Sequence, residues 1–149
     1  MDFLELMRSA IAVASSSPAD VPVGAVLVNE AGEVLFSASN QKELLNDPTA
    51  HAEIVVIRQA AAARGDWRLE DLTLVVTLEP CAMCAGAIAA ARIPRVVFGA
   101  WDEAVGAAGS RYDLLRDPKI AQTEVIGGVL ETECSELLKD FFSSKRALG

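Results

Sequence analysis

The sequence has 149 residues, so we expect one domain that covers residues 1–149. Thirteen basic and twenty-one acidic residues give a net charge of −8, the opposite of the balance usual in a dedicated nucleic-acid binder. No apolar run approaches the roughly 20 residues that span a bilayer, and residues 1–5 lack the basic start of a secretory signal, so we expect no membrane association. Three cysteines, an odd number, argue against a disulfide framework and favour a cytoplasmic location.

The pattern of apolar residues predicts the elements in chain order. Steps of three and four residues over 2–15 indicate an amphipathic helix, and two short valine-rich runs around a turn indicate a hairpin of strands 23–28 and 34–36. After a polar loop over 41–48, we expect helix 51–64, strand 72–78, helix 81–91, strand 95–99, a helical turn around 112–115, strand 123–130 and helix 131–146. Because helices separate most strands, we predict a three-layer α/β/α domain. Its central five-stranded sheet should be mixed, mostly parallel, with one antiparallel hairpin.

Two short motifs at predicted helix starts suggest a metal site. His51 opens one helix, and Cys81 and Cys84 open another directly after a central strand. The cysteines are three residues apart, so their sulfurs share one helix face, and a helix N-terminus favours thiolate over thiol. Two thiolates and one imidazole supply three zinc ligands and leave the fourth tetrahedral position to water, as in a catalytic zinc site.

Glu53 lies two residues after His51, so the two side chains converge only on a point beyond the helix end. Zinc at that point would lower the pKa of its bound water to about 7, and Glu53 could take the proton and return it to a leaving group. Two alternatives stay open: a redox pair formed by Cys81 and Cys84, or a structural zinc site completed by Cys134. We interpret Cys134 as an ordinary half-buried thiol, because no other ligand residue lies near it in the sequence.

The HAE motif at 51–53, followed by PCxxC at 80–84, resembles the signature of the zinc-dependent nucleobase deaminases of the cytidine and deoxycytidylate deaminase superfamily. The chain is most similar to the bacterial tRNA-specific adenosine deaminases of that superfamily. The matching stretches are VPVGAVLV (21–28), NDPTAHAEI (46–54), TLEPCAMCAGAI (77–88), RVVFGA (95–100), GAAGS (106–110) and DFF (140–142).

The resemblance implies a cytidine-deaminase-like fold and a homodimer with one Zn²⁺ in each subunit. It also implies hydrolysis of adenosine to inosine at the wobble position of a tRNA anticodon stem-loop, with no action on DNA. Carried over residue by residue, the zinc ligands are His51, Cys81 and Cys84, and the proton shuttle is Glu53.

Further roles follow from the resemblance, each with a simpler alternative. Asn40 matches the asparagine that holds the target base, although an asparagine at a strand end also bonds its own loop. Asp102 matches an aspartate near the nucleotide beside the flipped base, and its alternative is a solvated loop acid. Phe142 belongs to the tail aromatics that lie close to the anticodon loop, although an aromatic residue on a terminal helix is more often core. We interpret Glu79 as a helix-start carboxylate rather than a catalyst.

Two other functions remain open on these residues. A free-base or nucleoside deaminase, of the guanine or cytosine type, would use the same zinc mechanism, and the acidic charge favours such a small substrate. A zinc-stabilised binding module without activity would need no Glu53. If tRNA is the substrate, a few arginines should position it, and the candidates are Arg64, Arg68, Arg92 and Arg111.

Overall fold

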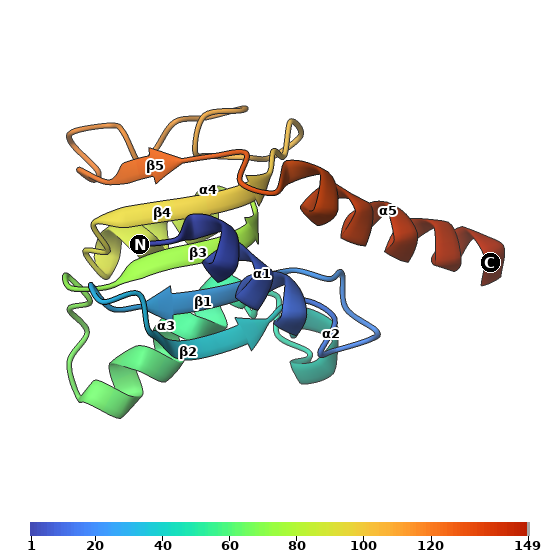
Figure 1. The fold of residues 1–149 in the computed structure, drawn as a ribbon, viewed down its shortest axis with the longest axis horizontal. Coiled ribbons are helices and arrows are strands. Elements are labelled where there is room, and N and C mark those ends of the chain that lie inside the picture. Colours follow the sequence, from blue (N-terminus) through green and yellow to red (C-terminus); the bar gives the residue numbers. More distant parts are fainter. Residues whose placement is uncertain (149) are drawn as a thin grey trace.

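The centre of the molecule is one sheet of five strands in the order β2-β1-β3-β4-β5 (Figure 1). The computed structural model describes residues 1–148 and the side chains of residues 1–146. The strands are β1 (Gly24–Val28), β2 (Val34–Ser39), β3 (Thr73–Leu78), β4 (Arg95–Ala100) and β5 (Glu124–Ile126). β1 pairs antiparallel with both β2 and β3, whereas β3, β4 and β5 pair in parallel. Four strands therefore run in one direction and β1 opposes them, which confirms a mixed sheet with a mostly parallel strand direction.

Helices cover both faces of this sheet, as the predicted three-layer architecture requires. The helices are α1 (Phe3–Val13), α2 (Lys42–Leu45), α3 (Ala52–Arg64), α4 (Ala82–Ala90) and α5 (Glu131–Leu148). Along β3, Leu74 and Val76 pack into the core beneath α3 and α4, whereas Val75 packs into the core beneath α1 and α5. This alternation follows from the two-residue period of a strand, and it buries β3 on both faces.

Glycine permits the close approach of α1 to the sheet. A Cβ atom on Gly24 of β1 would collide with the carbonyl oxygen of Ala10 in α1.

Asp2 caps the start of α1 by accepting hydrogen bonds from the backbone N–H groups of Leu4 and Glu5, at 3.1 and 3.3 Å. The serine-rich segment after α1 then leads into β1.

The structure corrects three local predictions. The helical turn expected around 112–115 is wrong: Asp113 forms an isolated antiparallel bridge with Ala108 instead, and the segment folds back so that Leu115 enters the core. The loop expected over 41–48 contains the short helix α2. The strand expected over 123–130 ends at Ile126, because the next glycine lies against the ring of Phe98, where a Cβ atom would not fit.

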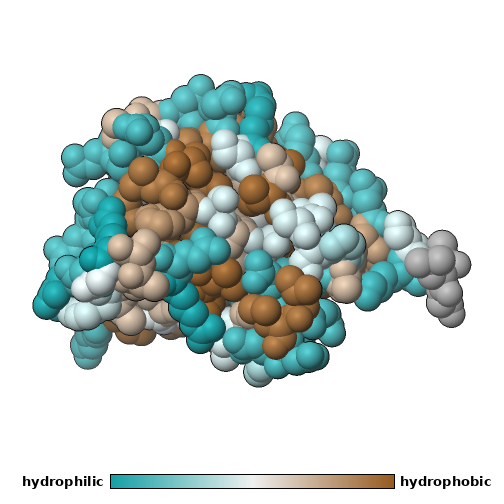
Figure 2. All heavy atoms as spheres, turned by 90° about the horizontal axis from the view of Figure 1, so that it is seen from below, coloured by the Kyte–Doolittle hydropathy of each residue, from teal (hydrophilic) through white to brown (hydrophobic). Residues whose placement is uncertain are grey.

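Edge strand β2 leaves apolar side chains at the surface, and Val34 and Leu35 are each 42% exposed. Figure 2 views the molecule from this side and shows apolar patches between hydrophilic rims. Leu44 and Leu45 of α2 are also exposed. Across residues 1–148, none of the helices is both long and apolar enough to span a membrane.

Candidate active site

The predicted metal ligands lie where α3 and α4 begin. His51 is the residue that precedes α3, Cys81 is the residue that precedes α4, and both have extended backbone conformations. Neither side chain caps its own helix, so each is free to point beyond the helix end. Cys84 lies in the first turn of α4 and is fully buried. Two helix N-termini, each with a partial positive charge, therefore face the same point and favour anionic ligands there.

The three side chains meet at distances that suit one metal ion. Nδ1 of His51 lies 3.6 Å from Sγ of Cys81 and 3.5 Å from Sγ of Cys84. Ligand atoms of all three lie within 4.8 Å of one another, and no other such group occurs in the described part of the chain. One imidazole nitrogen and two sulfurs are a donor set that fits zinc. The fold therefore brings the three predicted metal ligands together.

Cys134 takes no part in this cluster. It belongs to α5, is 1% exposed and packs against the sheet face that α1 also covers, so it is fully rather than half buried. This position contradicts the alternative of a structural zinc site with Cys134 as the fourth ligand. Three protein donors leave one tetrahedral position for water or substrate, as catalytic zinc sites do.

The electrostatics of the two cysteines also favour a cation. Hydrogen bonds with Cys84 and His51 lower the pKa of Cys81 to about 3, which makes this sulfur a thiolate at neutral pH. The pKa of Cys84 is raised instead, first by its hydrogen bond to Cys81 and then by burial. The hydrogen bond with Cys81 also raises the pKa of His51. A metal ion binds thiolates, so binding of a divalent cation here would release the proton of Cys84.

Glu53 lies in the first turn of α3, directly behind the cluster. Its side chain is 4% exposed, and this burial raises the pKa of its carboxyl group. A carboxyl with a raised pKa can accept and release a proton closer to neutral pH, which is the requirement for a proton shuttle.

A cavity of about 350 Å³ opens beside Glu53, His51 and Cys81. Its size suits a small ligand such as a nucleoside. All three predicted substrate contacts line it: Asn40 after β2, Asp102 after β4, and Phe142 on α5. Residues far apart in the sequence therefore form the walls of one site.

Each of these three residues also has local contacts. The side-chain amide of Asn40 donates to the carbonyl of Val21 at 3.1 Å, and its oxygen accepts from the backbone N–H of Lys42 at 3.3 Å. One amide N–H and one lone pair of Asn40 remain for a ligand. Asp102 accepts hydrogen bonds from two backbone N–H groups of its own loop, each at 3.2 Å. Phe142 is 45% exposed and packs edge-to-face on Phe141, so it is not a core residue.

Glu79 has a larger role than a helix-start carboxylate. It is 2% exposed and accepts hydrogen bonds from the backbone N–H groups of Asp102, Ala108 and Ser110 at 3.0, 3.0 and 2.9 Å. The hydroxyl of Ser110 donates to it as well. Glu79 thereby holds the loop 102–110 against the cavity. In the sequence, only the GAAGS stretch marks this loop. Nothing in that stretch identifies Glu79 as its hydrogen-bond partner.

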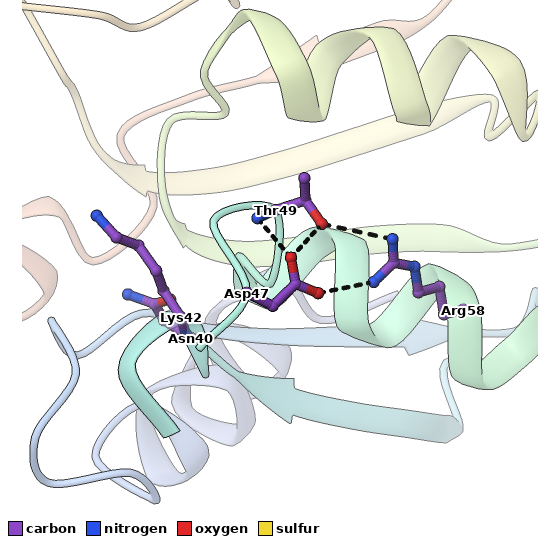
Figure 3. A network of polar contacts seen from close by, with 5 residues as sticks. All are labelled: Asn40, Lys42, Asp47, Thr49 and Arg58. Carbon is purple, nitrogen blue, oxygen red and sulfur yellow. Dashed lines mark hydrogen bonds and ion pairs between the residues drawn. The ribbon is translucent and has the colours of Figure 1, made fainter. Parts of the chain in front are cut away.

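A polar network orders the loop that leads to His51 (Figure 3). Asp47 accepts from the backbone N–H and hydroxyl of Thr49 at 2.9 and 2.8 Å. Arg58, about two turns into α3, pairs with Asp47 and also donates to the hydroxyl of Thr49, both at 3.4 Å. These contacts give a physical reason for the residues of the NDPTAH segment, because they fix the direction from which the chain enters α3.

The arginines expected to position RNA do not line the cavity. Arg64, Arg68 and Arg92 form ion pairs with Asp71, Asp66 and Glu70. Arg64 ends α3, about 20 Å from the end where His51 lies. Arg111 is exposed and lies outside the cavity walls too. The prediction of these arginines as positioning residues is therefore not supported.

The fold and the donor set together define the class of zinc-dependent deaminases, in which a sheet between helices presents zinc ligands from two helix starts. Residues 2–100 match the family of the cytidine and deoxycytidylate deaminase zinc-binding region. The chain belongs to this family of zinc-dependent hydrolytic enzymes.

Relatives of this chain share most of its length. A tRNA-specific adenosine deaminase of Haemophilus influenzae is 47% identical over 145 residues, which cover 95% of this chain and 84% of that protein. One of Bacillus subtilis is 48% identical over 128 residues, which cover 85% and 79% of the two chains. A solved structure from a study of A-to-I editing by tRNA A34 deaminases at the wobble position is 43% identical. It has a TM-score of 0.85 and covers 90% of this chain and 99% of that one.

Proposed function

We propose that this chain, as one deaminase domain over residues 1–149, converts adenosine to inosine at the wobble position of a tRNA anticodon. The observation that supports this most strongly is the His51, Cys81 and Cys84 cluster beside a nucleoside-sized cavity, in a chain nearly half identical to tRNA-specific adenosine deaminases. The reaction consumes one water molecule and releases ammonia.

In this hydrolysis, each residue of the site has a different role. His51, Cys81 and Cys84 would hold Zn²⁺, one per subunit, which supplies a Lewis acid that activates water at neutral pH. Glu53 accepts the proton of the attacking water and delivers it to the departing amine. Asn40 offers its free amide N–H and lone pair to the base edge. An anticodon base is already unpaired, which lowers the cost of bringing it into the cavity.

The expected homodimer is part of the same proposal. Helix α4 contains no charged residue, yet Ala82, Gly86 and Ala90 of this helix are exposed. A helix that is apolar on all sides is normally covered, and a second copy of the chain would cover it. Sedimentation equilibrium should give twice the mass of one chain. The three cysteines are free thiols, which suits the reducing cytoplasm where we expect the enzyme to act.

The test is inosine formation on a synthetic anticodon stem-loop that carries a wobble adenosine, with free adenosine, guanine and cytosine assayed in parallel. We expect conversion of the stem-loop only. Glu53→Gln should lower the rate at least about 100-fold while zinc content stays the same, because a general acid-base group contributes roughly 10²–10⁴. Glu30→Gln, an exposed glutamate in the turn after β1, is the matched control.

The other outcomes separate the alternatives. Conversion of a free base alone would retain the zinc chemistry and refute the tRNA substrate. Activity that survives Glu53→Gln would refute the proton shuttle. A zinc-loaded protein without activity on any of these substrates would indicate a binding module.

A further inference from the structure

Most of the arginines are neutralised within the chain. Seven of the nine form ion pairs with acidic side chains: Arg8, Arg58, Arg64, Arg68, Arg92, Arg95 and Arg116. None of the four lysines forms an ion pair with a side chain that the structure describes. The cations that are free to meet an external anion are therefore mainly lysines.

Two of these lysines line the cavity of the proposed site. Lys42 comes from α2, and Lys145 comes from the C-terminal part of α5. Both elements lie at the end of the sheet where β2 ends, and they are separate in space (Figure 1). The cavity thus has one lysine on each of two walls.

The backbone of Lys42 is held while its side chain stays free. Asp20 accepts hydrogen bonds from the N–H groups of Glu43 and Leu44 at 2.6 and 3.2 Å, which fastens the start of α2. The N–H of Lys42 itself donates to Asn40 at 3.3 Å. Figure 3 shows the Lys42 side chain extended beside Asn40, without a contact to the network around Asp47.

Lys145 is placed by aromatic side chains. Its ammonium nitrogen lies 5.1 Å from the ring centroid of Phe141, within range of a cation–π contact. Phe141 in turn packs against Phe142, with ring centroids 5.4 Å apart. All three residues line the cavity, so the charge of Lys145 is held beside the aromatic wall.

Five carboxylates line the cavity, and three of them, all but Glu43 and Glu53, are less able to repel an anion because backbone N–H groups bind their oxygens. Asp20 and Glu79 are each 2% exposed, and backbone N–H groups bind their oxygens. Asp102 accepts hydrogen bonds from two further backbone N–H groups. Among the residues that line the cavity, Lys42 and Lys145 are the only lysines, and no arginine is present.

We propose that Lys42 and Lys145 bind the two backbone phosphates that flank the target nucleotide of the RNA, and so position its base over Glu53. This inference rests on the proposed tRNA substrate. A polynucleotide has one phosphate on either side of a base, so it offers one phosphate to the lysine on each wall, whereas a mononucleotide has a phosphate on one side only. Both lysines are positioning residues, since neither is expected to touch the reacting atoms.

The test measures the salt dependence of binding between the stem-loop and the Glu53→Gln protein, which binds without turnover. Each phosphate contact on a single strand contributes about 0.7 to the slope of log K against log salt. Between 50 and 200 mM salt, the parent should lose about sevenfold more affinity than the Lys42→Ala, Lys145→Ala double variant. The control is Lys119→Ala, which removes an equally exposed lysine outside the cavity and should keep the parental slope. Replacement of both Lys42 and Lys145 by arginine should also keep the parental slope, because the charge is retained.

Three results would overturn an assignment. An unchanged slope in the double variant would refute the phosphate contacts, whereas failure of the parent to bind the stem-loop at 50 mM salt would refute the tRNA substrate instead. The third arm uses adenosine 5′-monophosphate as the ligand. If the double substitution weakens its binding as much as that of the stem-loop, the lysines hold one phosphate and the two-phosphate assignment is wrong.

Discussion

Replacement of Glu79 by Gln should destabilise the wall of the cavity that the loop 102–110 forms. The carboxylate accepts four hydrogen bonds, two on each oxygen, from Asp102, Ala108 and Ser110. An amide retains one of the two acceptor oxygens and turns an NH₂ group toward backbone donors. At least one hydrogen bond from a backbone N–H is lost, since only the hydroxyl of Ser110 can turn and accept from the new NH₂ group, and the remaining bonds lose the charge of their acceptor. Hydrogen bonds to a charged group contribute about 1.5–3 kcal/mol each, against about 0.5–1.5 kcal/mol for neutral ones. We therefore expect the free energy of unfolding to fall by about 3 kcal/mol or more.

The assay is urea unfolding of the zinc-loaded protein. With a slope of about 1–3 kcal/mol per molar urea, the midpoint should fall by roughly 1–3 M. Glu103→Gln is the matched control, since Glu103 is an exposed residue of the same loop. If Glu79→Gln unfolds at the same urea concentration as Glu103→Gln, the hydrogen bonds to Glu79 do not hold the loop, and the reasoning fails.

Two further predictions concern the cysteines. Cys84→Ala should lower bound zinc well below one ion per chain in elemental analysis, whereas Cys134→Ala should retain it, and zinc retained by Cys84→Ala would contradict the ligand set. Burial raises the pKa of Cys134 to about 11 from 9.0, so the unfolded thiol ionises first as pH rises. Relative to Cys134→Ala, the free energy of unfolding should therefore fall by about 1.4 kcal/mol per pH unit between pH 9 and 11, whereas the difference between the two proteins should stay constant below pH 8. A pH-independent difference between the two proteins would refute this.

The cluster of His51, Cys81 and Cys84 could be predicted from the sequence because its members stand at recognisable positions relative to helices. His51 and Cys81 both stand immediately before helices, and Cys84 follows within one turn. Such positions are visible in a linear sequence, since they combine a local pattern with a residue type of known chemistry. The long elements were predictable for a related reason: β3 contains only apolar residues and threonine, as is typical of a central strand buried on both faces.

What the sequence could not supply depends on contacts between distant segments. Glu79 binds Ser110, 31 residues away, and no local pattern links the two. The segment 112–115 forms no turn of helix, because Asp113 bridges to Ala108 five residues earlier and Leu115 packs into the core against residues from distant parts of the chain. The arginines were assigned to RNA by charge alone, whereas acidic partners near them in the fold neutralise them. Arg92 pairs with Glu70, 22 residues earlier in the chain.

The net charge of −8 and a polyanionic substrate are compatible because the two act over different distances. Charge on the far surfaces of the molecule is screened beyond about 10 Å at 0.1 M salt. A lysine that lines the cavity would meet a phosphate within a few ångströms, where screening is weak. Long-range steering depends on the net charge of the chain, which should therefore slow the encounter with RNA. Lys42 and Lys145 determine instead how the bound RNA is held. Addition of salt would then raise the association rate of the parent and raise its dissociation rate at the same time.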